Sequence, residues 1–255
     1  RCLVINIAIE GMDGVGKSTL CTNLSKHISS ISGMHAPVIR QPNDIIQGLR
    51  NCAKHPNVAV PRLDRIDSVE AIDLDQLRKG EAACMEATTL LMMGSMAATA
   101  EFTAKLDAAL ARVNRSLVVI HDRSLLSTLV YQAIARGNVH MIDSILATSA
   151  TFCRQRYDIT FVLTGRTNKI QQRVVSDCPF DKNIDVIAEG YAHYVDIIKK
   201  VASADMQDVF YRTFPNIVEI NTEHIDADQT LERALECLRN HYPFLHRTNQ
   251  SQPSS

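Results

Sequence analysis

The sequence predicts an α/β fold, in which a parallel sheet of about five strands is covered by helices on both faces. Short apolar runs without helical periodicity recur along the chain, which is typical of strands buried on both sides of a sheet. They alternate with longer segments whose apolar residues recur every three or four positions, as in helices. This alternation indicates a parallel sheet, and ligands of such sheets bind beyond the carboxyl ends of the strands. A functional site is therefore expected where polar residues follow predicted strands.

The strands and helices can be placed in order along the chain. Strands are predicted over residues 3–9, 38–40, 116–120, 159–163 and 217–220. Helices are predicted over residues 17–30, 125–135, 139–154, 168–175 and 186–210, with two consecutive helices between 73 and 113 and a last one capped near Asp226 or Asp228. These elements form one domain over residues 1–242, with an irregular insertion at 51–75 and a polar loop at 176–185. Residues 243–255, which include Asn, Gln, Ser and Pro, are expected to be disordered.

Composition and charge disfavour several functions. The 255 residues carry 27 Lys and Arg against 28 Asp and Glu, a formal net charge of −1, which is too balanced for a protein that holds nucleic acid or an anionic membrane by its charge. The longest uncharged stretch, residues 87–100, is too short to cross a membrane. Seven scattered cysteines, without the spacing of a metal site, favour a reducing compartment, and no secretory signal segment is recognised. We therefore expect a cytoplasmic protein that binds neither nucleic acid nor membrane.

The first predicted strand ends in a glycine-rich segment that fits the phosphate-binding pattern G-x-x-x-x-G-K-[ST]. Its glycines tolerate the positive φ angles that let backbone N–H groups surround a phosphate, and the following helix presents its positive end. Lys17 is expected to bridge the β- and γ-phosphates of a nucleoside triphosphate, and the Ser18 hydroxyl to bind Mg²⁺. This loop alone does not distinguish a kinase from a GTPase or a motor. The residues expected to bind the nucleotide are Gly11, Met12, Asp13, Gly14, Val15, Gly16, Lys17, Ser18 and Thr19.

A second polar strand end follows the apolar run at 116–120. Asp122 could hold a water bound to Mg²⁺ or orient its neighbours, and Arg123 could grip a second phosphate through two parallel hydrogen bonds. A structural ion pair is the alternative for these two residues. Taken alone, Tyr131 would more often be a core residue. Polar side chains that could line a nucleoside pocket continue on one face or adjacent faces of the next helix: Ser127, Thr128, Tyr131 and Gln132.

Residues 122–132, followed by Arg136 and Gly137, resemble the D-R-x-x-x-S-[ST]-x-A-Y-Q-x-x-x-R-G signature of bacterial-type thymidylate kinases. Residues 9–19 resemble the E-G-x-[DE]-G-x-G-K-[ST]-T loop of that family, and residues 40–42 resemble its R-E-P-G-G turn. The resemblance implies a P-loop NTPase fold with a mobile lid at about 176–185. It also implies transfer of the γ-phosphoryl group of ATP, with Mg²⁺, to a deoxynucleoside monophosphate, thymidylate being the family substrate.

The resemblance further implies roles for residues around the acceptor. Asp13 would face the sugar hydroxyl and phosphate region of the monophosphate, and Arg123 would hold its phosphate with help from Arg40 or Arg50. Side chains of the following helix would contact base and sugar. With two methionines that occupy the expected base pocket, the acceptor-binding residues would be Arg40, Arg50, Met92, Met96, Arg123, Thr128, Tyr131 and Gln132.

Catalysis of this kind needs no protein nucleophile, because the oxygen of the monophosphate is already ionised. Lys17, Arg123 and a cation from the lid would neutralise the transferring phosphoryl group. Since Gly14 stands where some family members carry a loop arginine, Lys182 would be the catalytic cation of the lid. Family members commonly form homodimers, and the apolar helices of residues 81–111 would provide the contact.

Two positions of the expected base pocket depart from the family pattern. Met92 and Met96 stand where the family carries an aromatic ring that stacks on thymine and an arginine that bonds its carbonyl oxygen. Methionine covers a base by dispersion but donates no hydrogen bond, so other deoxynucleotides could also be accepted. Gln41 replaces a glutamate in the turn after the second strand. Two alternatives stay open: a deoxynucleoside kinase, whose chemistry prefers a carboxylate base near that turn, and a nucleotide-binding protein with weakened catalysis.

Overall fold

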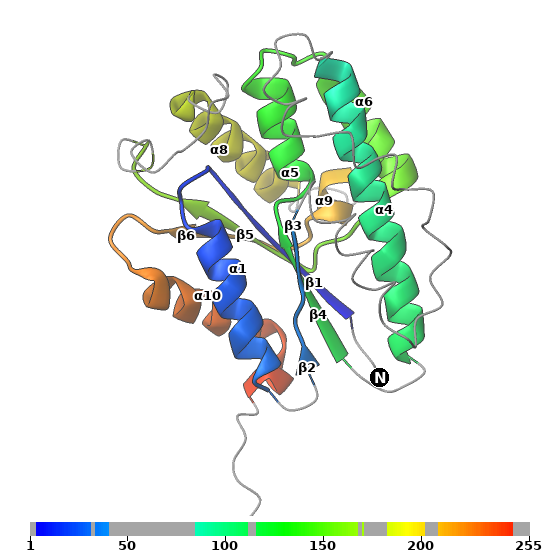
Figure 1. The fold of residues 1–255 in the computed structure, drawn as a ribbon. Helices are drawn as coiled ribbons and strands as arrows, with labels where there is room; N and C mark the ends of the chain where they lie inside the picture. The colour runs from blue at the N-terminus through cyan, green and yellow to red at the C-terminus, as the bar shows by residue number, and fades with distance from the viewer. Residues whose placement is uncertain are drawn as a thin grey trace, which may run out of the picture.

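A computed structural model describes residues 4–31, 34–40, 85–111, 116–167, 170, 183–201 and 209–246 of the chain. Within them, a parallel sheet lies between two layers of helices (Figure 1). Its strands are β1 (Val4–Gly11), β2 (Met34–His35), β3 (Val38–Arg40), β4 (Ser116–Asp122), β5 (Ile159–Thr164) and β6 (Ile217–Asn221). The spatial order is β2-β4-β1-β5-β6, and β3 also pairs with β4. Every pair is parallel, so the carboxyl ends meet at one edge, and the predicted fold class is confirmed.

The short segments β2 and β3 occupy a single edge position of the sheet. Met34 pairs with Ser116 and Val38 pairs with Ile120, so both segments keep the same register along β4. Pro37, between them, has no N–H to donate, but its carbonyl oxygen still accepts from the Ile120 N–H at 3.0 Å. The sheet therefore has five strand positions, as the sequence predicts.

The centre of the sheet is buried on both faces. Ile7 and Ala8 of β1 point to opposite faces, and both are 0% exposed. In Figure 1, one face is covered by α1 (Lys17–Ser29) and α10 (Ala227–His241), and the other by α4 (Met85–Ala111), α5 (Leu125–Thr128), α6 (Met141–Thr148) and α8 (Ile184–Val201). None of the described helices could span a membrane.

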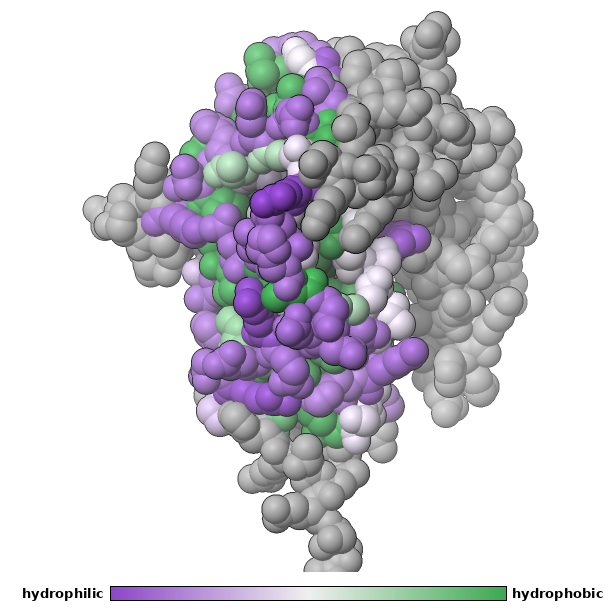
Figure 2. Space-filling view, turned by 90° about the vertical axis from the view of Figure 1, so that its left-hand side faces the viewer, coloured by the Kyte–Doolittle hydropathy of each residue, from purple (hydrophilic) through white to green (hydrophobic). Residues whose placement is uncertain are grey.

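The last helix shows how sequence produces its local structure. Asp226 caps α10, because its carboxylate accepts from Gln229 N at 2.8 Å while the Gln229 side chain accepts from Asp226 N at 3.0 Å. Leu235 and Leu238 lie on the buried side of this helix. Its outer side belongs to the face shown in Figure 2, which is mainly hydrophilic with only small apolar patches. One of the two predicted caps, Asp226, is thus the cap of this helix.

Wide helical turns follow α5 and α6. Residues Leu129–Ile134 and Ser149–Cys153 are π-helical, and Ala135 N, for example, donates to Val130 O at 2.8 Å. The predicted helices 125–135 and 139–154 are therefore each divided into an α-helical and a π-helical part. Turns of this type are rare and occur frequently at functional sites.

Two predicted boundaries were wrong. α8 begins at Ile184, inside the predicted polar loop, because Ile184 and Ile187 are buried against the core. Pro243–His246 form a short 3₁₀ helix where the disordered tail was expected to begin, because Leu245 is buried. The structure also shows α9 (Val209–Thr213), which begins at the end of the predicted helical region 186–210 and continues beyond it.

Several other predictions concern residues outside the described ones. They include the insertion at 51–75, the lid at 176–182, the tail at 247–255 and all of the predicted helix 168–175 except Ile170. In the region of two predicted consecutive helices, residues 85–111 form the single helix α4, and residues 73–84 are not described.

Candidate functional site

The predicted phosphate loop connects the central strand β1 to α1 at the carboxyl edge of the sheet. Gly11, Gly14 and Gly16 have φ angles of 133°, 82° and 108°, which residues other than glycine rarely adopt. At Gly11 a side chain would also collide with β5, since an added Cβ would lie 2.4 Å from Leu163 O. No side chain among the described residues caps α1 at Gly16, so the helix N-terminus remains available to an anion.

Lys17 lies against this loop and is buried, with 5% of its surface exposed. Its Nζ donates to Met12 O at 2.7 Å and lies 3.4 Å from Asp13 Oδ1. Burial, and then repulsion by Arg123, lower the pKa of Lys17 to about 8, against the attraction of nearby carboxylates. A cation in such surroundings attracts phosphate strongly, because little water screens its charge.

The two residues predicted to bind Mg²⁺ come together beside the loop. Ser18 Oγ donates to Asp122 Oδ2 at 3.0 Å. Arg40, at the end of β3, donates to both residues, from Nη2 to Ser18 Oγ at 2.8 Å and from Nε to Asp122 Oδ2 at 3.3 Å. In the part of the chain that the structure describes, no three His, Cys, Asp or Glu side chains gather as a metal site. A hydroxyl and a carboxylate nevertheless fit Mg²⁺, which commonly takes one or two protein oxygens and completes its shell with phosphates and waters.

Arg123 lies between β4 and α5, beside Asp13 of the phosphate loop. Its Nη2 forms an ion pair with Asp13 Oδ1, and its guanidinium carbon lies 4.8 Å from the centre of the Tyr131 ring. The Tyr131 hydroxyl accepts a hydrogen bond from Asp13 N at 3.1 Å. Burial alone would lower the pKa of Arg123, but Asp13, with help from Tyr131, Tyr191 and Glu10, raises it above its ordinary value. A permanently charged guanidinium therefore lies beside the phosphate loop.

Glu10 is a site residue to which the sequence analysis assigned no role. It precedes Gly11 in β1 and is 0% exposed. Its Oε1 accepts hydrogen bonds from the backbone N–H groups of Ser124 at 2.6 Å and Ser127 at 3.2 Å. The signal in the sequence is a carboxylate within a mainly apolar strand, because such a group is costly to bury unless donors surround it.

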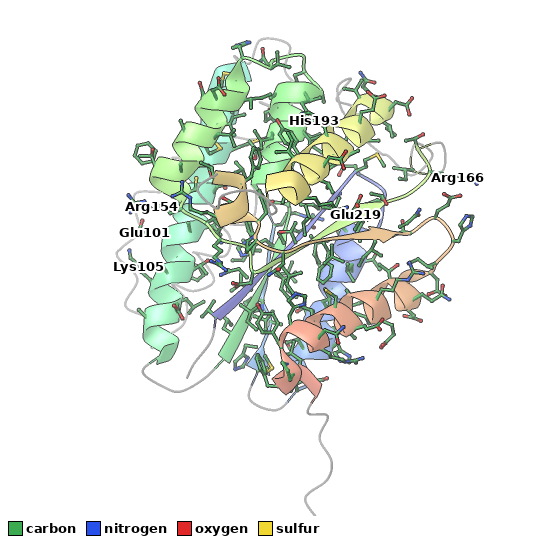
Figure 3. The ribbon with its side chains drawn as sticks, turned by 180° about the vertical axis from the view of Figure 1, so that it is seen from behind. Glu101, Lys105, Arg154, Arg166, His193 and Glu219 are labelled. Atoms are coloured by element: carbon green, nitrogen blue, oxygen red, sulfur yellow. The ribbon has the colours of Figure 1, made fainter. Side chains whose placement is uncertain are left out.

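A cavity of about 300 Å³ opens on the other side of the phosphate loop. It lies between α1 and the turns that follow β5 and β6, and Figure 3 shows Arg166 at the first of these turns. Since β4 and β5 flank β1 on opposite sides, this cavity and Arg123 lie on opposite sides of the loop. The lining includes Val15, Gly16, Thr19, Gly165, Arg166 and Thr222.

Comparisons with known proteins agree with this architecture. No protein-family model matches the chain, and no curated protein matches it in sequence. Among solved structures, the chain is similar to thymidylate kinase from Candida albicans, with a TM-score of 0.62 and 17% identity over 98% of this chain and 96% of that one. It is also similar to thymidylate kinase from Ehrlichia chaffeensis, with a TM-score of 0.54 and 19% identity over 92% of this chain and 98% of that one. The chain has the thymidylate kinase fold.

Within the thymidylate kinase fold, the residues predicted to contact the acceptor base lie on α4 and on the helical segment after Arg123. Thr128 Oγ1 donates to Met96 Sδ at 3.6 Å, and both side chains are buried. Met92, one turn earlier on α4, is partly buried. Gln132 is 3% exposed, and its Oε1 has no hydrogen-bond partner in the described structure. This oxygen is an unused acceptor near the predicted base pocket.

Two residues predicted from the thymidylate kinase resemblance, Arg50 and Lys182, lie outside the described residues. The structure brings together the phosphate loop, the Ser18 and Asp122 pair, Arg40 and Arg123 at one edge of the sheet. The signature residues of the chain therefore share one region of the thymidylate kinase fold, although more than 100 positions separate Asp13 from Arg123.

Proposed function

We propose that the protein is a nucleoside monophosphate kinase, which transfers the γ-phosphoryl group of ATP to a deoxynucleoside monophosphate. The observation that carries the proposal is the position of Asp13 between two cations, since its Oδ1 lies 3.4 Å from Lys17 Nζ and pairs with Arg123 Nη2. Lys17 belongs to the phosphate loop and Arg123 follows another strand, so the two proposed positions for phosphate groups adjoin. Phosphoryl transfer between nucleotides requires that the two phosphates be held side by side.

Catalysis would consist of positioning and charge neutralisation. Lys17 would hold the β- and γ-phosphates of ATP, and Arg123 would hold the acceptor phosphate with Arg40 and Arg50. Mg²⁺, bound by Ser18 with Asp122 beside it, would withdraw charge from the phosphates. Lys182 remains the proposed cation of the lid. The base of ATP is proposed to occupy the cavity beside Arg166, whose planar guanidinium can stack on an aromatic ring.

The acceptor is proposed to be dTMP, with tolerance of other deoxynucleoside monophosphates. Gln132 Oε1, buried and without a partner, is suited to accept the N–H of a thymine ring. Met96 lies against Thr128 and offers no donor to a base carbonyl, so a contact that would exclude other bases is missing. The similar Candida albicans thymidylate kinase is described as having broad substrate specificity. We propose the same property for this chain.

The decisive experiment mixes the protein with ATP, Mg²⁺ and, separately, dTMP, dUMP, dCMP, dAMP and dGMP, and measures formation of each diphosphate. We expect dTDP to form and at least one other deoxynucleoside diphosphate to accompany it. Thymidine is included as an acceptor, because phosphorylation of the free nucleoside alone would favour a deoxynucleoside kinase. ATP binding by calorimetry without turnover on any acceptor would favour a nucleotide-binding protein and contradict the proposal.

A homodimer formed through α4 is also proposed. Ala104 and Ala108 are exposed on this helix beside the charged Glu101, Lys105 and Asp107, so a second copy would cover a mixed surface with an apolar part. Sedimentation at micromolar concentration would give the mass of the dimer, and the mass of one chain would contradict this proposal. The cytoplasmic location expected from the cysteines remains part of the proposal, and Cys21, Cys153 and Cys237 are free thiols in the described structure.

A further inference from the structure

Glu10 collects hydrogen bonds from two separate elements. Its Oε1 accepts from Ser124 N at 2.6 Å, from Ser127 N at 3.2 Å and from the Ser124 hydroxyl. Its Oε2 accepts from the Ser127 hydroxyl and from Tyr191 OH at 3.1 Å. The first four donors lie at the N-terminus of α5, whereas Tyr191 belongs to α8. One buried carboxylate thus fixes the start of α5 and joins it to α8.

These contacts hold the residues that follow Arg123 in the chain. Arg123 has a φ of 81°, a left-handed conformation that a non-glycine residue keeps only when its surroundings impose it. Its N–H donates to Ile9 O at 3.1 Å, and the next residue, Ser124, is bound to Glu10. Ser127 Oγ, also bound to Glu10, lies 3.5 Å from Arg123 Nη1. Ile9 and Glu10, at the end of β1, therefore hold the backbone from which the Arg123 side chain extends. Through Ser127, Glu10 is also connected to one nitrogen of the guanidinium.

Tyr191 reaches the same guanidinium by a second route. It is 3% exposed, and its hydroxyl lies 2.9 Å from Ser127 Oγ as well as 3.1 Å from Glu10 Oε2. Its ring meets the Tyr131 ring edge to face, with 6.4 Å between the ring centres. The guanidinium of Arg123 in turn lies over the face of the Tyr131 ring. Moving the Tyr191 hydroxyl would therefore disturb both neighbours of Arg123.

We propose that Glu10 and Tyr191 are positioning residues of the acceptor site, which act by holding Arg123 in the orientation that receives the phosphate of the monophosphate. This inference rests on the proposed function. Neither residue touches the nucleotides, and loss of either weakens handling of the monophosphate while the ATP side of the phosphate loop is left intact. The effect therefore belongs to the KM and Kd of the acceptor, and not to the KM of ATP.

Two tyrosines on the same helix provide a matched comparison. Tyr194, like Tyr191, is buried in α8, but its hydroxyl has no hydrogen-bond partner among the described residues. Tyr191→Phe and Tyr194→Phe each remove one hydroxyl and keep the ring. We expect Tyr191→Phe to raise the KM and the calorimetric Kd for dTMP by about tenfold to a hundredfold, as for the loss of a hydrogen bond to a charged group. We expect Tyr194→Phe to change both by less than about twofold, and both variants to keep the KM for ATP within about twofold.

A double-mutant cycle shows whether Tyr191 acts through Arg123. If it does, Tyr191→Phe loses its effect on the Kd for dTMP once Arg123 is replaced by alanine, so the further change is less than about twofold. A structural role alone would give the same loss in both backgrounds. Thermal unfolding of each variant measures any general destabilisation, and Glu10→Gln, which keeps the length of the side chain, is expected to raise the KM for dTMP less than Glu10→Asp, which shortens it.

The outcomes separate this inference from the proposed function. Equal dTMP affinities of Tyr191→Phe and Tyr194→Phe, or an undiminished effect in the Arg123→Ala background, overturn the positioning role while an active wild type keeps the proposed function. A wild type that binds dTMP without forming dTDP contradicts the proposed function, and the binding comparison still decides the positioning role. A wild type that neither binds nor phosphorylates any monophosphate overturns both.

Discussion

Replacing Arg123 by alanine is expected to perturb the acceptor side of the site and to leave the ATP side of the phosphate loop largely unchanged. The guanidinium is proposed to make two charge-assisted hydrogen bonds to the acceptor phosphate. At about 1.5 to 3 kcal/mol each, their loss amounts to about 3 to 6 kcal/mol. The expected consequence is a decrease in kcat/KM for dTMP of about 10²- to 10⁴-fold.

The structure adds a second contribution to this loss. Asp13, which pairs with Arg123 and lies 3.4 Å from Lys17, would keep its negative charge beside an incoming phosphate dianion. Repulsion between them should add to the decrease. Asp13→Asn in the Arg123→Ala background is therefore expected to recover about threefold to tenfold of kcat/KM, even though Asp13→Asn alone removes a partner of Arg123.

The assay measures initial rates of dTDP formation, with dTMP varied at saturating ATP and then ATP varied at saturating dTMP. Lys26→Ala is the control, because Lys26 is exposed in the last turn of α1, at the opposite end of that helix from the phosphate loop. Its kcat/KM should match that of the wild type. A kcat/KM for Arg123→Ala within about threefold of the wild type, or a loss expressed chiefly in the KM for ATP, would refute the reasoning.

Three further predictions concern the loop and the core. Lys17→Ala should lower kcat by about 10²-fold or more and weaken ATP binding measured by calorimetry, since a buried cation is lost; unchanged ATP affinity would contradict its role. Gly11→Ala should lower the free energy of unfolding by about 2 to 4 kcal/mol in urea denaturation, because its φ is 133° and the Cβ would lie 2.4 Å from Leu163 O, whereas Gly16→Ala, with no atom within 4 Å of its Cβ, should cost less. His121 is buried and its pKa is lowered to about 3. Below pH 6.5 its imidazole therefore binds a proton in the unfolded chain but stays neutral in the folded chain, which favours unfolding. Between pH 6 and 4.5 the wild type should therefore lose about 1.4 kcal/mol of stability per pH unit more than His121→Asn, and parallel curves would show that His121 is protonated in the folded protein.

The strands and the phosphate loop could be predicted because their signals are local. An apolar run of strand length, ended by glycines at fixed spacing, predicts β1 and the loop without knowledge of any distant residue. The meeting of Ser18 with Asp122 also followed from a general rule, since parallel strands bring their carboxyl ends to one edge. Which strands are neighbours did not follow, because the pairing of β1 with both β4 and β5 depends on the whole fold.

The contacts of Glu10 could not be predicted, because its donors are far away in the sequence. Ser124 and Tyr191 lie 114 and 181 positions from it, and no spacing rule connects them. The burial of Leu245 and the early start of α8 were missed for a similar reason: in both cases distant core residues decide whether a short segment is ordered. The division of the helix after Arg123 into α- and π-helical parts has no recognised sequence signal either.

The π-helical turn after α5 limits which deletions the protein can tolerate. Tyr131 and Gln132 both lie in the π-helical turn Leu129–Ile134, where Ala135 N reaches back five residues to Val130 O. Deleting one residue here would restore ordinary helical winding at little conformational cost, yet it would rotate the Tyr131 ring away from the Arg123 guanidinium and change the direction of the Gln132 side chain. A surface loop tolerates such a deletion, but this stretch should not, and we expect the shortened chain to fold and to lose the proposed binding of the monophosphate.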